Sequence, residues 1–210
     1  MLARRPAPRL TLAALLVLGC GSNTPELPPG VTAPESCLAP AYPPGPYGSE
    51  AGSVLRNACF QGFTAPAQAH TLEPIALADF YDPDGSRGID VLLVNTAAVW
   101  CSACRIEHET LPEHARELGP RGLVILSALF QDQARNPANL EDLSTWTETF
   151  STNFPMVLDP SYSFGSYASA ETAPLNLVID TRTMTLLAKY VGDQSAVMWP
   201  TIEGALAGAH

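Results

Sequence analysis

Runs of mostly apolar residues recur along the chain from residue 74 onward. The clearest is Val91–Val94, which lies between Asp90 and Asn95 and is rich in branched side chains. Such a run is typical of a strand that is buried on both faces of a sheet. Comparable runs predict further strands at 74–80, 123–129, 156–159, 175–180 and 184–191. The last two are expected to form a hairpin.

Helix-forming residues follow the Val91–Val94 run. They predict a helix over 102–118 that stops at the helix-ending pair Gly119-Pro120. Pro112 lies inside this segment, and because proline removes a backbone donor we expect it to kink or split the helix.

Two more helices are expected further along. Asn136-Pro137 predicts the cap of a helix over about 138–150, because asparagine is a good N-cap and proline is tolerated at the first helical position. A short helix is expected after Pro200. Alternation of buried strands with helices favours an α/β fold with a central mixed sheet and helices on both faces, over residues 53–210.

The first 20 residues have the layout of a signal peptide. Three arginines without an acid precede an apolar run, Leu10–Leu18, that is too short to cross a bilayer as a helix. Val17–Cys20 resembles a bacterial lipobox, which predicts that cleavage leaves Cys20 as a lipidated first residue. The alternative is an ordinary secretory signal, with Cys20 incidental or removed.

Residues 21–52 contain many prolines, glycines, serines and threonines. Such a composition cannot bury enough apolar surface to order itself, so we expect a flexible tether that holds the domain away from a membrane. Gly21-Ser22 lacks the aspartate that resembles an inner-membrane retention signal in many bacteria, which favours the outer membrane.

The net charge of the whole chain is −10, from 11 basic and 21 acidic residues. Removal of residues 1–20 takes away three of the basic residues and none of the acids, which leaves −13. Such a surface repels nucleic acid. No phosphate-binding glycine loop is visible either, so nucleotide and nucleic-acid binding are excluded from the candidate functions.

Five cysteines are present, and two of them lie outside the processing site and the Cys-x-x-Cys pair. In an oxidising compartment Cys37 and Cys59 are expected to form a structural disulfide, which in the entropy model stabilises the fold by about 3 kcal/mol. The alternative is a pair of free thiols. A zinc site is less favoured, because structural zinc sites usually combine two Cys-x-x-Cys clips, and we expect no metal.

Cys101-Ser102-Ala103-Cys104 directly follows a buried strand and opens a helix. A sulfur at a helix N-terminus faces free backbone N–H groups and the positive end of the helix dipole, which favour the thiolate. Cys101 can then attack a disulfide, and Cys104 can resolve the mixed disulfide. Ser102 and Ala103 carry no charge, so the helix end, helped by Arg105, must supply the activation. No cofactor is needed beyond the Cys101–Cys104 disulfide itself.

The stretch from Val91 to Glu107, with Trp100 before the first cysteine, resembles the active-site strand and helix of the thioredoxin superfamily, and most closely its extracytoplasmic TlpA-like branch. The resemblance covers about residues 70–200. It implies that Trp100 packs beside the thiol. It also implies a cis peptide bond at Ala173-Pro174, before a strand that ends in Ile-Asp, where a backbone edge could bind an extended substrate.

Two polar positions carry further meaning in this resemblance. Thioredoxins proper have a buried aspartate where this chain has Asn95, whereas TlpA-like proteins resemble this chain in having asparagine there and a glutamate at the position of Glu107. One helical turn beyond Cys104, a partly buried Glu107 could exchange the proton of the resolving thiol. The alternative is an ordinary solvated residue. His108 and His114 on the same helix are expected to lie on its solvated face.

The chain also departs from the family pattern. Thr96-Ala97-Ala98 replaces an aromatic-rich stretch, Ser-Ala is unusual between the cysteines, and Pro112 lies later than the family's helix proline. These departures bear on the redox potential rather than on the fold.

The leading hypothesis is therefore that the protein is a thiol-disulfide oxidoreductase. Its expected partners are protein thiols or disulfides in the cell envelope and an unidentified electron donor. We expect a monomer that faces the periplasm on its lipid anchor. A thiol peroxidase of the AhpC/TSA-like kind is the first alternative, although Ala98 stands where such proteins need threonine. A copper-binding assembly factor is the second, although such factors place three residues between the cysteines and add a distal histidine.

Overall fold

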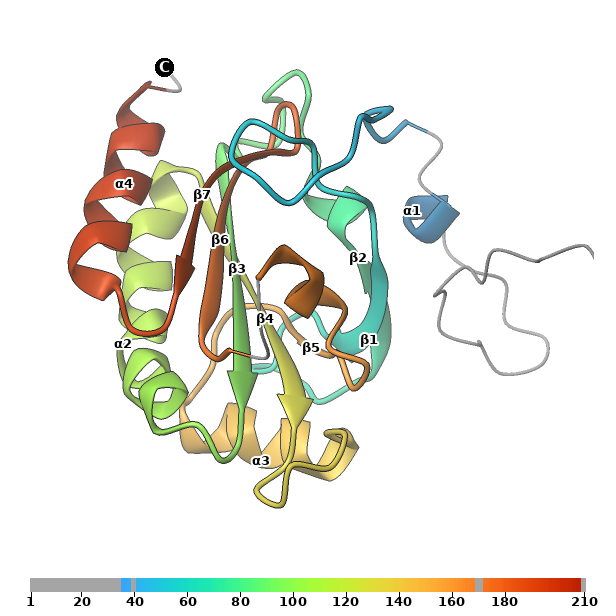
Figure 1. The fold of residues 1–210 in the computed structure, drawn as a ribbon, viewed down its shortest axis with the longest axis vertical. Coiled ribbons are helices and arrows are strands. Elements are labelled where there is room, and N and C mark those ends of the chain that lie inside the picture. The colour runs from blue at the N-terminus through green and yellow to red at the C-terminus, as the bar shows by residue number, and fades with distance from the viewer. Residues whose placement is uncertain (1–34, 39–40, 169–171, 209–210) are drawn as a thin grey trace, which may run out of the picture.

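The computed structural model describes residues 35–38, 41–168 and 172–208. Within this part of the chain the strands form one mixed sheet in the order β2-β1-β5-β4-β3-β6-β7 (Figure 1). Central β3 pairs in parallel with β4 and antiparallel with β6. The strands are β1 (Cys59–Phe63), β2 (Glu73–Ala76), β3 (Val91–Ala98), β4 (Leu123–Gln131), β5 (Met156–Leu158), β6 (Leu175–Asp180) and β7 (Thr185–Val191).

In chain order α2 lies between β3 and β4, and α3 lies between β4 and β5, in line with the predicted alternation of strands and helices. The α-helices are α1 (Glu35–Leu38), α2 (Ser102–Leu118), α3 (Leu140–Thr149) and α4 (Ser195–Gly208), and the 3-10 helices are η1 (Leu77–Phe80), η2 (Gly119–Arg121) and η3 (Ser163–Tyr167). None of the helices in the described ranges is long and apolar enough to span a membrane.

Both faces of the sheet are covered, but unequally. Side chains alternate along a strand, so Val91, Leu93 and Ala97 of β3 face one layer while Leu92 and Val94 face the other. The first layer contains α2, α3 and α4, and Figure 1 shows α2 and α4 side by side on this face. The second layer is built by η1, η3 and an N-terminal segment rather than by long helices.

That N-terminal segment corrects the expected domain boundary. Residues 41–52 were expected to belong to a flexible tether, yet Tyr42 is buried in the second core layer together with Leu55. The backbone N–H of Gly52 donates to the carbonyl of Leu186 at 2.8 Å, which ties the segment to β7. A few large apolar side chains thus offset the poor composition. The predicted signal peptide, Cys20 and the first part of the tether lie outside the described residues.

Helix α3 begins later than predicted. Its N-cap is Asn139, whose side-chain oxygen accepts from the backbone of Glu141 and of Asp142, while Asp142 accepts from the Asn139 N–H. This reciprocal pair is a capping box. Asn136, the expected cap, instead bonds to the carboxylate of Asp132 in the preceding turn.

Proline and glycine also act differently from expectation in α2 and α4. Helix α2 runs unbroken through Pro112, which is buried, and α4 starts five residues before Pro200 rather than after it. The predicted stop at Gly119-Pro120 becomes the short helix η2, and Gly119 itself is right-handed. The left-handed turn falls on Gly122, at a φ of 99° that favours glycine.

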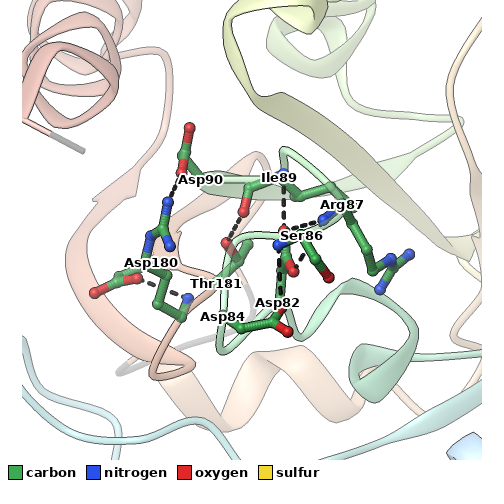
Figure 2. A network of polar contacts seen from close by, with 9 residues as sticks. Asp82, Asp84, Ser86, Arg87, Ile89, Asp90, Asp180 and Thr181 are labelled. Carbon is green, nitrogen blue, oxygen red and sulfur yellow. Dashed lines mark hydrogen bonds and ion pairs between the residues drawn. The ribbon is translucent and has the colours of Figure 1, made fainter. Parts of the chain in front are cut away.

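The end of the sheet where β3 begins is closed by the loop before that strand. The Asp82 carboxylate accepts the backbone N–H of Ile89 at 3.1 Å, and the Thr181 hydroxyl donates to the Ile89 carbonyl. Both contacts are drawn in Figure 2. Arg182 pairs with Asp90 at 2.8 Å. These contacts fix the start of β3, and the opposite end of this strand leads into the candidate site.

Candidate active site

The turn between β3 and α2 places Cys101 at the start of a helix. Cys101 is the N-cap of α2, with extended backbone angles, and its Sγ accepts a hydrogen bond from the backbone N–H of Cys104 at 3.1 Å. The two sulfurs are joined in a disulfide, with the Cα atoms 5.3 Å apart. Cys101 retains 4% of its surface and Cys104 none, so an attacking group can reach only Cys101.

An aromatic residue flanks Cys101 on the chain, as expected. Trp100 is half-buried, its ring meets Phe130 edge to face, and its Nε1–H donates to the Gln131 side chain at 2.9 Å. The guanidinium of Arg135 lies over this ring, 3.8 Å from its centroid. These contacts hold the indole in one orientation, directly before Cys101 in the chain.

The Ala173-Pro174 peptide bond is cis, and strand β6 follows it. Thr96 of β3 pairs with Leu175, and its hydroxyl accepts the Leu175 N–H at 3.0 Å. This register brings Ala173 and Pro174 to the end of β3 that leads to Cys101. The Pro174 carbonyl already accepts a hydrogen bond from Gly192 at 2.8 Å.

Arg105, which was expected to help activate Cys101, contacts aromatic rings of α3 and its C-cap. Its guanidinium is over the rings of Trp146 and Phe150, at 5.6 and 5.3 Å from the centroids. It therefore extends toward α3.

A buried carboxyl group lies one helical turn beyond Cys104. Glu107 is 3% exposed, and its oxygens accept hydrogen bonds from Asn95 Nδ2 at 2.9 Å and from Asn176 Nδ2 at 3.0 and 3.2 Å. Asn95 and Asn176 lie opposite each other on β3 and β6, and Asn95 Nδ2 also donates to Asn176 Oδ1 at 2.8 Å. Of the two alternatives for Glu107, the buried one is therefore correct.

The environment of Glu107 favours its neutral form. Burial raises the pKa of Glu107 to about 7, and the nearby charge of Asp193 adds to this, while the amide hydrogen bonds from Asn176 and Asn95 oppose it. A carboxyl group that titrates near neutral pH can both give and take a proton there.

The expectation that His108 is solvated is wrong. His108 has no exposed surface, its Nδ1 bonds to the carbonyl of Cys104 at 2.9 Å, and its Nε2 lies 3.0 Å from Ser127 Oγ. The ring packs on Trp146 and Phe150, and burial lowers its pKa to about 4. The helical spacing of Cys104, His108, Leu111 and Leu118 could have indicated this, because the four residues share one face of α2.

His114, the other histidine expected to be solvated, is half-buried. Its ring stacks on Trp199 of α4, with the centroids 3.6 Å apart. It therefore belongs to the packing between α2 and α4.

A second disulfide joins Cys37 and Cys59 and links α1 to β1, with a sequence separation of 22. Cys20 lies outside the described residues. Among residues 35–38, 41–168 and 172–208, no group of three or more His, Cys, Asp or Glu side chains is arranged to hold a metal ion.

Known proteins resemble parts of this chain, although no family model matches it. Over 108 residues it is 31% identical to the thiol:disulfide interchange protein DsbE of Pseudomonas fluorescens biotype C, a region that covers 51% of this chain and 54% of the relative. The chain thus spans about half the length of this curated relative.

Solved structures resemble a larger part of the chain. A candidate thiol:disulfide interchange protein DsbE from Chlorobium tepidum matches with a TM-score of 0.59 and 18% identity, over 75% of this chain and 98% of that one. The thioredoxin domain of a thiol-disulfide oxidoreductase from Bacteroides vulgatus matches with a TM-score of 0.55 and 15% identity, over 77% and 99%. At these identities the likeness shows the fold, and the predicted thioredoxin fold is confirmed.

Proposed function

We propose that this protein is a thiol-disulfide oxidoreductase that uses the Cys101–Cys104 pair on protein thiols or disulfides. The observation that carries the proposal is the position of Cys101, whose Sγ is the N-cap of α2 and accepts the Cys104 N–H at 3.1 Å. When the pair is reduced, this N–H and the helix dipole stabilise a thiolate on Cys101. The names of the similar proteins support the same class of reaction.

Electrons and protons balance in the following way when the dithiol reduces a substrate disulfide. The Cys101 thiolate attacks one substrate sulfur, the substrate S–S bond breaks, and the other substrate sulfur leaves as a thiolate. Cys104, after giving its proton to the Glu107 carboxylate, attacks Cys101 Sγ and expels the second substrate thiolate. Two electrons have passed to the substrate. An electron donor must then reduce the Cys101–Cys104 disulfide.

The substrate chain would bind beside Cys101. Trp100 and the backbone at Ala173 are the groups proposed to contact it, and Pro174 sets the position of that backbone. Because the Pro174 carbonyl is already bonded to Gly192, Ala173 is the residue whose backbone would pair with an extended substrate.

The proposed location is extracytoplasmic. The signal-like residues 1–20 and the lipobox-like sequence before Cys20 support export, lipidation at Cys20 and attachment to a bacterial membrane that faces the periplasm. The substrates would then be exported proteins, and the protein would act as a monomer.

Insulin reduction by dithiothreitol tests the catalytic assignment. The wild-type protein should accelerate the precipitation of insulin chains, and Cys101→Ala should slow it to the rate with dithiothreitol alone. Glu109→Gln, a change at an exposed residue of the same helix, is the control and should retain activity. Equal rates for wild type and Cys101→Ala would remove the assignment. Equilibration of the pair against a glutathione series then gives its potential and hence the favoured direction.

A separate measurement tests the role of Glu107. In Glu107→Gln the resolution of a mixed disulfide with Cys101 should slow, because Cys104 loses its nearby proton acceptor, and the inflection near pH 7 should vanish from the pH profile. An unchanged profile would assign Glu107 to packing alone.

A further inference from the structure

A chain of buried polar side chains connects Glu107 to a second titratable group. Ser127 Oγ on β4 donates to Asn95 Oδ1 at 2.9 Å, and it also lies 3.0 Å from His108 Nε2. Asn95 in turn donates to Glu107. All four side chains are 3% exposed or less, so water is kept away from the chain. His108 has no part in the steps proposed above, yet it is bonded directly to the carbonyl of the resolving Cys104.

Too few hydrogens are available to pair every donor and acceptor of this buried polar network. The Cys104 carbonyl can only accept, so His108 Nδ1 carries a hydrogen and donates it. In a neutral imidazole Nε2 is then an acceptor. The single hydroxyl hydrogen of Ser127 is given to Asn95, so two lone pairs face each other between His108 and Ser127. Asn95 cannot help in this orientation, because both hydrogens of its amide are given to Glu107 and Asn176.

Protonation of the imidazole removes this mismatch. If His108 takes up a proton, its Nε2–H donates to Ser127, which suits an ionised Glu107 at the other end. If Glu107 takes up a proton instead, the amides of Asn95 and Asn176 can turn together, and Ser127 then accepts from Asn95 and donates to the neutral His108. The one O–H of Glu107 can donate to only one of the two amide oxygens that then face it, so the unpaired contact moves to Glu107. A buried network of this kind favours states in which every group is paired.

We propose that Glu107 and His108 are coupled through Asn95 and Ser127 into one proton-binding unit, in which ionisation of the carboxyl group raises the proton affinity of the imidazole. His108 is then a positioning residue that supports the charged form of Glu107 when Cys104 has received its proton. The part of this inference that concerns Cys104 rests on the proposed function, whereas the coupling itself does not.

The surroundings contain few other charges that could produce such coupling. Asp193, from the loop before α4, is the charged neighbour that raises the pKa of Glu107. On α3 the neighbours of His108 are the rings of Trp146 and Phe150, and Arg105 lies over these rings. While the disulfide is intact, neither Cys101 nor Cys104 titrates, so the oxidised protein isolates the pair.

Nuclear magnetic resonance of the oxidised protein tests the coupling directly. The imidazole nitrogens of His108 and the side-chain carboxyl carbon of Glu107 are followed from pH 3 to pH 9, a range that brackets pKa values of about 4 and about 7. Coupled groups report the same transitions, so the His108 signals should move with the Glu107 midpoint near pH 7. Signals of His108 that stay constant through the Glu107 transition would overturn the proposal.

Ser127→Ala removes the hydroxyl group that links Asn95 to His108, and it changes neither titrating group. It should abolish the response of His108 at the Glu107 midpoint, and it should raise the pKa of Glu107, because Asn95 loses the donor that holds its amide toward the carboxylate. Thr152→Val removes a buried hydroxyl group that does not belong to this hydrogen-bonded network. It is the matched control and should keep the response. A His108 response that persists in Ser127→Ala would refute the coupling.

Glu107→Gln gives a second route should Ser127→Ala fail to fold. In this variant the His108 transition near pH 7 must disappear, and its persistence contradicts the proposal. None of these measurements depends on catalysis. An inactive protein with coupled titrations would refute only the proposed function, and an active one without them would refute only the coupling.

Discussion

Replacing Glu107 by glutamine is expected to change how the stability of the fold depends on pH. Burial is the chief cause of the rise in the Glu107 pKa from an ordinary value of 4.5 to about 7. Between these two values the folded protein holds the proton more tightly than the unfolded chain does. The contribution of Glu107 to stability is therefore greatest below pH 4.5 and is lost as the pH rises through 7.

The size of the effect follows from the same two values. Each unit of pKa difference corresponds to about 1.4 kcal/mol, so wild type should lose roughly 2 to 3 kcal/mol from this group between pH 5 and pH 8. Glutamine does not ionise, and the variant should lack this loss. It also places an amide against two amide donors, which should cost about 1 kcal/mol at every pH. The variant should thus be about as stable as wild type at pH 5 and more stable at pH 8.

Urea unfolding of the oxidised proteins at pH 5 and pH 8 measures this difference. Other groups that titrate in this range, apart from the coupled His108, contribute equally to both proteins and cancel. Glu109→Gln, at an exposed position on α2, removes the same charge and should keep the wild-type pH dependence. If Glu107→Gln followed wild type in parallel between the two pH values, the carboxyl group would not be held in a desolvated site, and the argument for its proton exchange with Cys104 would fail.

Three further substitutions test other parts of the structure. Asn139→Ala should destabilise the fold by about 1 kcal/mol in thermal or urea unfolding, because it removes the observed cap of α3. Replacement of Cys37 and Cys59 by serine should cost about 3 kcal/mol by the loop-entropy estimate, measured by urea unfolding, and an unchanged midpoint would contradict a stabilising bond. Asn95→Asp places a second carboxyl group against Glu107, so it should raise the Glu107 pKa and destabilise the fold more at pH 8 than at pH 5.

The central part of the fold could be predicted because local sequence and tertiary packing agree there. Val91–Val94 is apolar at every position, so it suits a strand with a layer on both faces, whatever the register. Cys101 and Cys104 follow the end of this strand, and the helix-forming residues after them favour α2 over a strand or a loop. The ends of helices were harder to predict, because Asn136 and Asn139 are both good N-cap residues. Only Asn139 is followed three residues later by Asp142, which completes the capping box.

The polar part of the site could be predicted only in outline. Spacing along α2 places Glu107 one turn beyond Cys104, but its two amide donors come from β3 and β6, and Asn176 is 69 residues away in the sequence. Burial of such a group depends on strand pairing, which no local pattern contains. His108 was missed for another reason: histidine beside two glutamates indicates a solvated face, although the helical spacing of its apolar neighbours indicates the opposite.

The burial of five polar side chains opposes folding, and this cost is linked to the chemistry proposed for Cys104. The five residues are Asn95, Glu107, His108, Ser127 and Asn176. Amide, hydroxyl and carboxyl groups lose hydration when they leave water, and each needs a partner in the core to compensate. The partners here are sufficient to keep Glu107 in place but not to restore its ordinary pKa. An apolar core at these positions would be compatible with the same sheet and helices, but it would lack the carboxyl group that we propose exchanges a proton with Cys104. The free energy lost to desolvation of Glu107 is thus the quantity that would fit the site to proton exchange at the resolving cysteine.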